Sequence, residues 1–264
     1  KNAAGDPEPL LLRRVAEDGT KWVALPSRAK AELSNAVGVA NLLRHPVTQL
    51  NELFRKAIRD PYGLVLLTGP TGSGKTTTLY AALSEIKSPM KNILTIEDPV
   101  EYRLEGVNQI QVKPSIGLTF AGGLRAFLRQ DPDIIMVGEV RDLETAEICV
   151  QAALTGHLVF STVHTNDAPS AVTRLIDIGI APYLLSSTLS LVVAQRLLRR
   201  LCQECRQAYE PLPAIRERFQ ITEELLYRAK GCEQCSSTGY RGRVGGYEVM
   251  TLDRNLCDLV AKGA

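Results

Sequence analysis

The sequence predicts an α/β fold built around a largely parallel sheet, with a small cysteine-rich module towards the C-terminal end. Short apolar runs alternate with helical patterns between residues 64 and 178, and this alternation is typical of parallel strands that helices cover on both faces. One apolar run leads into a glycine-rich turn, and three others end in polar clusters. Beyond residue 201, turn residues and paired cysteines replace the alternation.

Residues 1–46 are expected to form a partial N-terminal domain or a linker. Short apolar runs indicate strands, and a helical pattern ends at Pro46, which cannot continue a helix. No role is assigned to His45, directly before this proline. In chain order, the first expected elements are strands at 10–12 and 22–25 and helices at 29–44 and 48–58.

A glycine-rich turn follows the apolar run 64–67 and precedes a helical pattern. It fits the P-loop pattern G-x-x-x-x-G-K-[ST] at every fixed position, so its amides are expected to bind phosphates at a helix N-terminus. Lys75 would reach the β- and γ-phosphates, and the Thr76 hydroxyl would bind Mg²⁺. The alternative is a glycine-rich turn with a surface lysine. The predicted nucleotide-binding residues are Gly69, Pro70, Thr71, Gly72, Ser73, Gly74, Lys75, Thr76 and Thr77.

Strands and helices continue to alternate after this turn. Apolar runs of a few residues predict buried strands, and apolar residues spaced by three or four predict helices. The expected strands are at 92–97, 134–137, 158–163 and 244–249, with a hairpin arm at 104–112, and the expected helices are at 76–87, 120–129, 144–154, 168–178 and 184–200.

Polar residues follow three of the expected strands, at Glu97-Asp98, Glu139 and His164. Because the carboxyl ends of parallel strands form one rim, where open α/β sheets bind ligands, we expect these residues beside the glycine-rich turn. Glu139 and Glu97 are candidates for activating water, and His164 for sensing the γ-phosphate. The alternatives are a solvated acid at residue 139, a turn or capping role at 97 and a structural histidine at 164.

Gly138 stands where many P-loop proteins carry an aspartate, so the Mg²⁺ shell is expected to depend on Glu139 itself. His157, at the other end of the fourth strand, is open to a functional or a structural role.

Two C-x-x-C pairs are separated by 26 residues. Each pair can wrap one edge of a tetrahedron, and four thiolates would close a structural Zn²⁺ site. We expect this module at residues 201–243, with a helical insert at 222–229 spanning the long gap. A redox role for the pairs is the alternative. The predicted metal ligands are Cys202, Cys205, Cys232 and Cys235.

The composition of the chain excludes several classes of protein. Hydrophobic residues make up 45% of the 264 residues and charged residues 23%, as in ordinary soluble domains. The net charge of +2 gives no broad basic field for nucleic acid, and no apolar run approaches the roughly 20 residues of a membrane span. Six cysteines without a secretion signal indicate a reducing compartment.

Together these motifs resemble the secretion-type hexameric ATPases, specifically the assembly ATPases of type II secretion systems and type IV pili. The resemblance covers residues 47–252. The matching segments are 69–79 as Walker A, 95–102 as Asp box, 129–142 as Walker B, 155–166 as His box, and the two cysteine pairs with residues 238–243 as tetracysteine motif.

The resemblance implies a RecA-like ATPase core at residues 47–200 that binds ATP and Mg²⁺ and works in a hexameric ring. It implies hydrolysis that powers type II secretion or the assembly of pilin-like subunits. The expected partners are an inner-membrane platform protein and accessory secretion or pilus proteins, with no nucleic acid, and the expected location is cytoplasmic, peripheral to the inner membrane. The zinc motif favours secretion or pilus-extension ATPases over pilus-retraction ATPases, which lack it.

The two ends of the chain depart from the family pattern. Residues 1–46 do not match the N-terminal domain that supplies arginines to a neighbouring subunit, so Arg13, Arg14 and Arg28 are candidates by location alone. Residues 244–264 are expected to hold a final strand and a truncated segment, and the initial Lys1 indicates a fragment. The alternatives are a DNA-handling RecA-like or conjugative NTPase and a zinc-ribbon scaffold that binds nucleotide without turnover.

Overall fold

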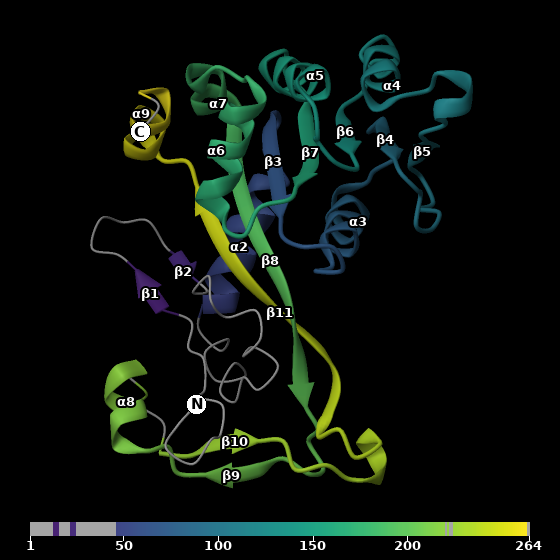
Figure 1. Ribbon diagram of the computed structural model, residues 1–264. Helices are drawn as coiled ribbons and strands as arrows, with labels where there is room; N and C mark the ends of the chain where they lie inside the picture. The colour runs from purple at the N-terminus through teal and green to yellow at the C-terminus, as the bar shows by residue number, and fades with distance from the viewer. Residues whose placement is uncertain (1–12, 16–21, 25–45, 220, 222–223, 263–264) are drawn as a thin grey trace. The chain divides into compact units, whose positions relative to one another are not determined.

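The computed structural model of the 264-residue chain describes residues 13–15, 22–24, 46–219, 221 and 224–262 (Figure 1). The expected strand at 10–12, the helix at 29–44, Arg28 and His45 lie outside the described residues. The chain divides into two compact units, which are described separately. We call residues 51–195 with 249–262 the sheet unit; the other unit holds residues 196–248, which we call the cysteine unit, together with the described residues up to Leu50.

The sheet unit is built on parallel strands, as the sequence predicts. The strand order is β11-β8-β3-β7-β6-β4-β5, and β3 pairs in parallel with both β7 and β8 (Figure 1). β4 likewise pairs in parallel with β5 and β6, and β6 with β7. The strands are β3 (Gly63–Thr68), β4 (Ile93–Glu97), β5 (Asn108–Gln111), β6 (Ile134–Val137), β7 (Leu158–Val163), β8 (Leu189–Leu201) and β11 (Tyr240–Thr251). Residues 196–201 of β8 and 240–248 of β11 belong to the cysteine unit.

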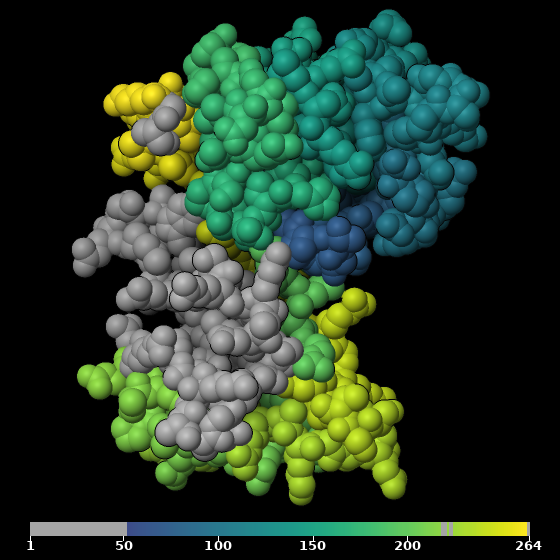
Figure 2. Space-filling model, viewed as in Figure 1, coloured from purple at the N-terminus to yellow at the C-terminus, as the bar shows by residue number. Residues whose placement is uncertain are grey.

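The core of this unit lies along the central strands. Every residue of β3 and β7 is buried, so both faces of these strands are covered. In the space-filling view, side chains of the segment from α4 to α7 cover the strands on the face that is shown (Figure 2). The helices are α3 (Lys75–Ile86), α4 (Phe120–Phe127), α5 (Leu143–Leu154), α6 (Ala168–Ile178), α7 (Pro182–Thr188) and α9 (Arg254–Ala261), with a short 3₁₀ turn, η2 (Pro114–Ile116).

Side-chain caps fix where several of these helices begin. The Asp142 carboxylate accepts a hydrogen bond from the Thr145 N–H at the start of α5, and Asp167 accepts one from Ser170 at the start of α6. Such caps satisfy N–H groups that have no partner within the helix. No helix among the described residues is both long enough and apolar enough to cross a bilayer.

Two expectations about the sheet unit are wrong. The expected helix at 184–200 is instead a short helix, α7, followed by the strand β8, which pairs with β3 from Leu64↔Leu189 to Thr68↔Ala194. The expected hairpin arm at 104–112 contains β5, an edge strand that runs parallel to β4 rather than forming a hairpin. Both errors concern pairing between distant segments.

The cysteine unit contains a pair of short antiparallel strands. The expected helical insert at 222–229 is wrong, because residues 226–228 form a strand that pairs with residues 207–209 and the helix lies earlier in the chain. Arginine side chains lie over rings of this pair, with the Arg206 guanidinium 4.2 Å from the centroid of Tyr227. The elements are β9 (Gln207–Tyr209), α8 (Pro213–Phe219), β10 (Leu226–Arg228) and a 3₁₀ turn, η3 (Glu233–Cys235).

Three elements come earlier in the chain. β1 pairs in antiparallel fashion with β2, which corresponds to the expected strand at 22–25. The amphipathic helix expected at 48–58 is present, shifted by one or two residues. Their bounds are β1 (Arg13–Val15), β2 (Trp22–Ala24) and α2 (Pro46–Ala57).

Candidate active site

The glycine-rich turn joins β3 to α3 and has the features of a phosphate cradle. Gly72 and Gly74 have φ angles of 74° and 87°, which glycine adopts without a steric penalty. A Cβ added at Gly72 would meet no atom within 4 Å, and no side chain caps the N-terminus of α3 at Gly74. The turn is therefore open at the helix end where the dipole favours an anion.

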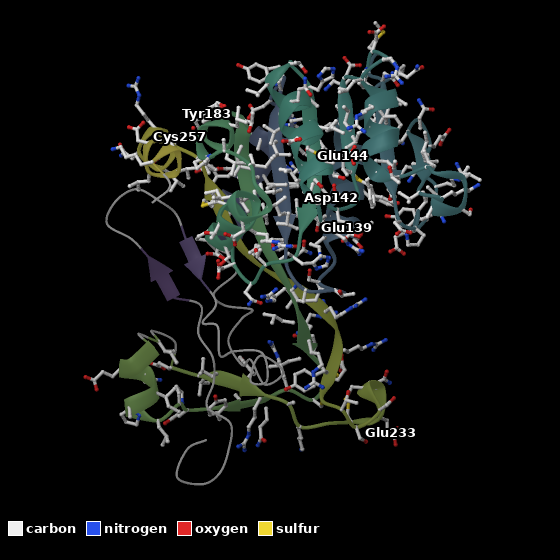
Figure 3. All side chains as sticks on the ribbon, turned by 45° about the horizontal axis from the view of Figure 1, so that its top comes forward. Glu139, Asp142, Glu144, Tyr183, Glu233 and Cys257 are labelled. Carbon is white, nitrogen blue, oxygen red and sulfur yellow. The ribbon has the colours of Figure 1, made fainter. Side chains whose placement is uncertain are left out.

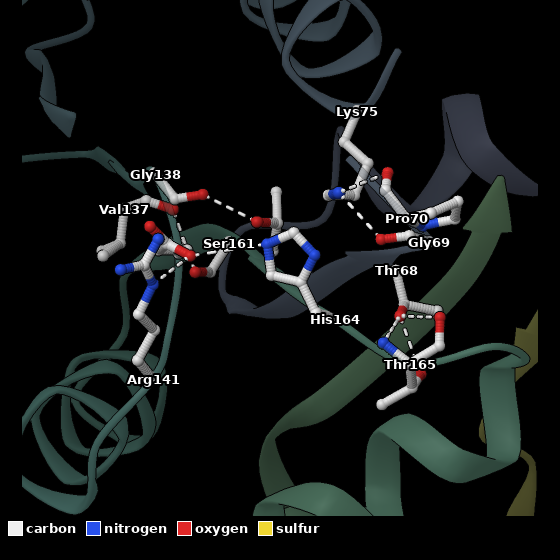
Figure 4. A network of polar contacts seen from close by, with 12 residues as sticks. Thr68, Gly69, Pro70, Lys75, Val137, Gly138, Arg141, Ser161, His164 and Thr165 are labelled. Atoms are coloured by element: carbon white, nitrogen blue, oxygen red, sulfur yellow. Dashed lines mark hydrogen bonds and ion pairs between the residues drawn. The ribbon is translucent and has the colours of Figure 1, made fainter. Parts of the chain in front are cut away.

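Two polar side chains of the turn are buried. Ser73 Oγ is buried and has no hydrogen-bond partner among the described residues, so it is available to a bound group. The Lys75 Nζ donates to the carbonyl oxygens of Gly69 and Pro70 at 2.9 and 3.2 Å (Figure 4). These contacts hold the ammonium over the turn, and Thr76, next in the chain, is half-buried. The residues present fit a nucleotide phosphate with its Mg²⁺.

The end of β3 is tied to the segment after β7. The Thr68 Oγ1 accepts a hydrogen bond from the Thr165 N–H at 2.8 Å and donates to the Thr165 carbonyl at 3.1 Å. Thr165 directly follows His164 (Figure 4). This pair therefore fixes the histidine-bearing segment beside the strand that leads into the glycine-rich turn.

Glu139 lies at the end of β6, next to the same rim. Its side chain is 11% exposed, and its Oε2 lies 2.5 Å from the Arg141 Nε and 3.5 Å from the His164 Nε2 (Figure 4). The Val140 N–H donates to the Thr162 carbonyl, which holds this segment against β7. Asp142, three residues later, is occupied as the cap of α5 (Figure 3). The structure thus brings Glu139 and His164 together, as the sequence predicts.

Gly138 allows the end of β6 to lie directly against β4. Its N–H donates to the Ile96 carbonyl at 2.8 Å. A Cβ at this position would approach the Glu97 Cα to 3.3 Å and the Phe120 ring to 3.6 Å. The backbones of β6 and β4 are therefore in close contact at this position, where a side chain would otherwise separate them.

Glu97 occupies a different environment from Glu139. It is only 2% exposed, and its Oε1 accepts a hydrogen bond from the Thr95 Oγ1 at 2.5 Å. Sequence reasoning missed two further partners of this carboxylate, Tyr80 and Gln109. They are 17 and 12 residues away in the chain, and no local pattern connects them to Glu97.

His157 lies at the opposite end of β7 from His164. Its Nδ1 donates to the Ala152 carbonyl at 3.0 Å, and the backbone carbonyl of His157 accepts from the Gly63 N–H. The ring thus satisfies a carbonyl at the C-terminal end of α5. These contacts favour the structural role for this histidine.

The four candidate metal ligands come together in the cysteine unit. Their Sγ atoms all lie within 4.8 Å of one another, with separations of 3.9 Å between Cys202 and Cys232, 3.8 Å between Cys205 and Cys235 and 3.7 Å between Cys232 and Cys235. Thiolates about 2.3 Å from a Zn²⁺ ion at the corners of a tetrahedron lie about 3.8 Å apart. The cluster has the dimensions of a tetrahedral zinc site.

The electrostatic surroundings of the sulfur atoms are uneven. Burial raises the pKa of Cys205 to about 12. Burial would also raise the pKa of Cys235, but N–H groups of Cys232 and Gly239 point at its Sγ from 3.2 and 3.1 Å and lower that pKa to about 6. Ionising all four sulfur atoms in one buried cluster would require a cation among them.

Comparisons with known proteins agree with this geometry. Residues 34–264 match the family described as type II/IV secretion system protein. The chain is 56% identical over 210 residues to the type II secretion system ATPase E of Vibrio cholerae, an alignment that covers 78% of this chain and 42% of that protein. It is 54% identical over 220 residues to the type IV pilus assembly ATPase PilB of Myxococcus xanthus, covering 80% of this chain and 38% of that protein.

A solved structure shows the same fold. The crystal structure of the pilus retraction motor PilT with bound ADP has a TM-score of 0.61 and 34% identity, and the match covers 80% of this chain and 53% of that one. The chain spans about two-fifths of the length of the curated relatives it matches.

Proposed function

The chain belongs to the type II/IV secretion system protein family, and on this premise we propose that it binds and hydrolyses ATP as part of a motor. The motor would power type II secretion or type IV pilus assembly, the activities named for its relatives. The observation that carries the proposal is the rim itself, where the open glycine-rich turn, the buried Lys75 and the Glu139–His164 pair lie at the ends of β3, β6 and β7.

Each residue of the rim has a proposed role. The amides of residues 72–77, with Ser73 and Lys75, hold the phosphates, and Thr76 holds Mg²⁺. The bound ion would neutralise charge on the phosphates. Glu139 accepts the proton of the attacking water or orients it through the metal shell, and His164, beside it, reports the γ-phosphate. Glu97 supports the same reaction from within the core.

We also propose that the four cysteines hold one Zn²⁺ with a structural role. All four corners of the tetrahedron would be protein thiolates, so the ion has no open position for chemistry. A redox function is disfavoured, because all four sulfur atoms converge in one cluster instead of lying as two separate C-x-x-C pairs.

In the full-length protein, we propose, the sheet unit works in a homo-hexameric ring on the cytoplasmic side of the inner membrane. A platform protein in that membrane and accessory secretion or pilus proteins would be its partners. Within the part of the chain that the structure describes, Arg141 is the arginine beside Glu139, and it pairs with that carboxylate. An arginine supplied by a neighbouring subunit would then complete the site.

The test is ATP turnover by the purified chain across a range of protein concentrations. We expect Mg²⁺-dependent hydrolysis that Lys75→Ala abolishes by weakening nucleotide binding, while Lys113→Ala, an exposed lysine outside the rim, behaves as wild type. Nucleotide binding without turnover at any concentration would contradict the ATPase and favour a scaffold. Strong stimulation by DNA would instead favour a DNA-handling NTPase.

A further inference from the structure

The Glu97 carboxylate is held by donors from three different elements. Its Oε1 accepts hydrogen bonds from the Thr95 Oγ1 on β4, at 2.5 Å, and from the Gln109 Nε2 on β5, at 3.2 Å. Its Oε2 accepts one from the Tyr80 hydroxyl on α3. Both oxygens are therefore engaged, and the side chain has its position set from three directions.

The environment of Tyr80 keeps its hydroxyl a hydrogen-bond donor to Glu97. It is 1% exposed, and it lies on α3, the helix whose first residue is Lys75. Burial, together with the neighbouring Glu97 carboxylate, raises the pKa of Tyr80, so the hydroxyl keeps its proton at neutral pH. A buried carboxylate is costly without such donors.

Gln109 has only one orientation compatible with its contacts. Its Oε1 accepts from the Leu104 N–H at 2.7 Å, which turns its Nε2 towards the Tyr80 hydroxyl and the Glu97 Oε1, both at 3.2 Å. The Tyr102 ring meets the Tyr80 ring edge-on, with centroids 4.7 Å apart. Residues 102–109 thus contact Tyr80 and Glu97 from the side of the edge strand β5.

We propose that Tyr80 and Gln109 are positioning residues, which fix the Glu97 carboxylate between the phosphate-binding helix and the end of β4 and so set the rate of hydrolysis. This proposal rests on the ATPase function proposed above. The backbone of Gly138, the residue before Glu139, also packs against the backbone of Glu97. A displaced Glu97 would therefore disturb the spacing between α3 and the Glu139 segment.

The test is Tyr80→Phe, which keeps the ring and removes only the donor. We expect kcat to fall about tenfold, because displacements of a fraction of an ångström in an active site have effects of this order. The affinity for a fluorescent ATP analogue should stay within about twofold of wild type, since the phosphate cradle is intact. Tyr62→Phe, an exposed tyrosine just before β3, should leave both quantities unchanged.

A stability cycle shows whether Tyr80 acts through Glu97. The melting temperatures of Tyr80→Phe, Glu97→Gln and the double variant are compared, and the loss in the double variant should be smaller than the two single losses together. Additive losses, or a kcat for Tyr80→Phe within twofold of wild type, would overturn the positioning role. Absence of turnover in the wild-type chain would refute the ATPase proposal instead.

Discussion

The two units of this chain are stabilised by different kinds of interior. In the sheet unit, β3 and β7 are buried along their whole length, and the interior is made of aliphatic and aromatic side chains such as Leu66 and Phe160. In the cysteine unit, a cluster of the buried residues consists of Cys202, Cys205 and Cys235, with Cys232 packed against it. One interior forms by excluding water, whereas the other, on the zinc proposal above, is held together by a metal ion.

The largest expected effect is the loss of the metal. Structural Zn²⁺ sites contribute roughly 10–16 kcal/mol of binding free energy in small peptides at neutral pH, so chelation or Cys232→Ser should unfold the cysteine unit. Elemental analysis should find one zinc per chain in wild type and none in the variant, and limited proteolysis should cut within residues 196–248. Cys257→Ser, a cysteine on α9 outside the cluster, is the control. Freshly purified, reduced protein without zinc would contradict the zinc proposal and, with it, this difference between the two units.

Glu139→Gln should show that the sheet unit carries the chemistry. The amide can neither take a proton nor match the charge of the carboxylate near Mg²⁺, so turnover should fall at least about a hundredfold while nucleotide binding persists. ATPase rates and analogue binding are measured beside Glu144→Gln, an exposed glutamate on α5, which should be unaffected. A wild-type rate for Glu139→Gln would transfer the role to Glu97.

Truncating an aliphatic side chain tests whether the stability of the two units depends on different kinds of interior. Leu66 on β3 is fully buried, so Leu66→Ala should lower the free energy of unfolding of the sheet unit by roughly 2–5 kcal/mol through the cavity it leaves. Zinc content should not change. Leu212→Ala, at an exposed site in the cysteine unit, should have almost no effect, and equal losses at the two positions would contradict the distinction.

The smallest expected effect concerns assembly. If a neighbouring subunit supplies an arginine to the site, specific activity should rise with protein concentration, because more of the sites are then in assembled rings. We expect the chain to be largely monomeric and a poor ATPase when dilute. Light scattering and ATPase assays on the same samples give the answer. Full, concentration-independent turnover by a monomer would place the arginine within this chain. The first residues to replace would then be Arg141, beside Glu139, and Arg174, on α6.

The elements predicted from local patterns agree closely with the structure. The strands β6 and β7 and the helix α6 have the bounds expected from their apolar patterns. The errors occur where a distant partner decides the conformation. The segment that begins at Leu189 has enough apolar residues for either structure, and it is a strand because β3 offers it a parallel edge. In the same way, residues 226–228 are a strand because β9 lies beside them.

The candidate site was predictable to the same extent. The glycine-rich turn and the cysteine pairs are contiguous motifs, so their residue types and spacing were enough to find them. Glu139 and His164 follow apolar strands, and the rule that parallel strands share a rim placed them together. Tyr80 and Gln109 were missed because they reach Glu97 only through the packing of α3 and β5 against β4.

The close packing at Gly138 also limits which residues this position can accept. The commoner P-loop arrangement carries an aspartate at this position, but any side chain here would press on the backbone of Glu97 at 3.3 Å. An aspartate there would require the backbone at Glu97 to give way by a few tenths of an ångström, so the replacement should carry a packing cost that glycine does not. Gly138 thus exchanges a possible metal ligand for close contact between β6 and β4.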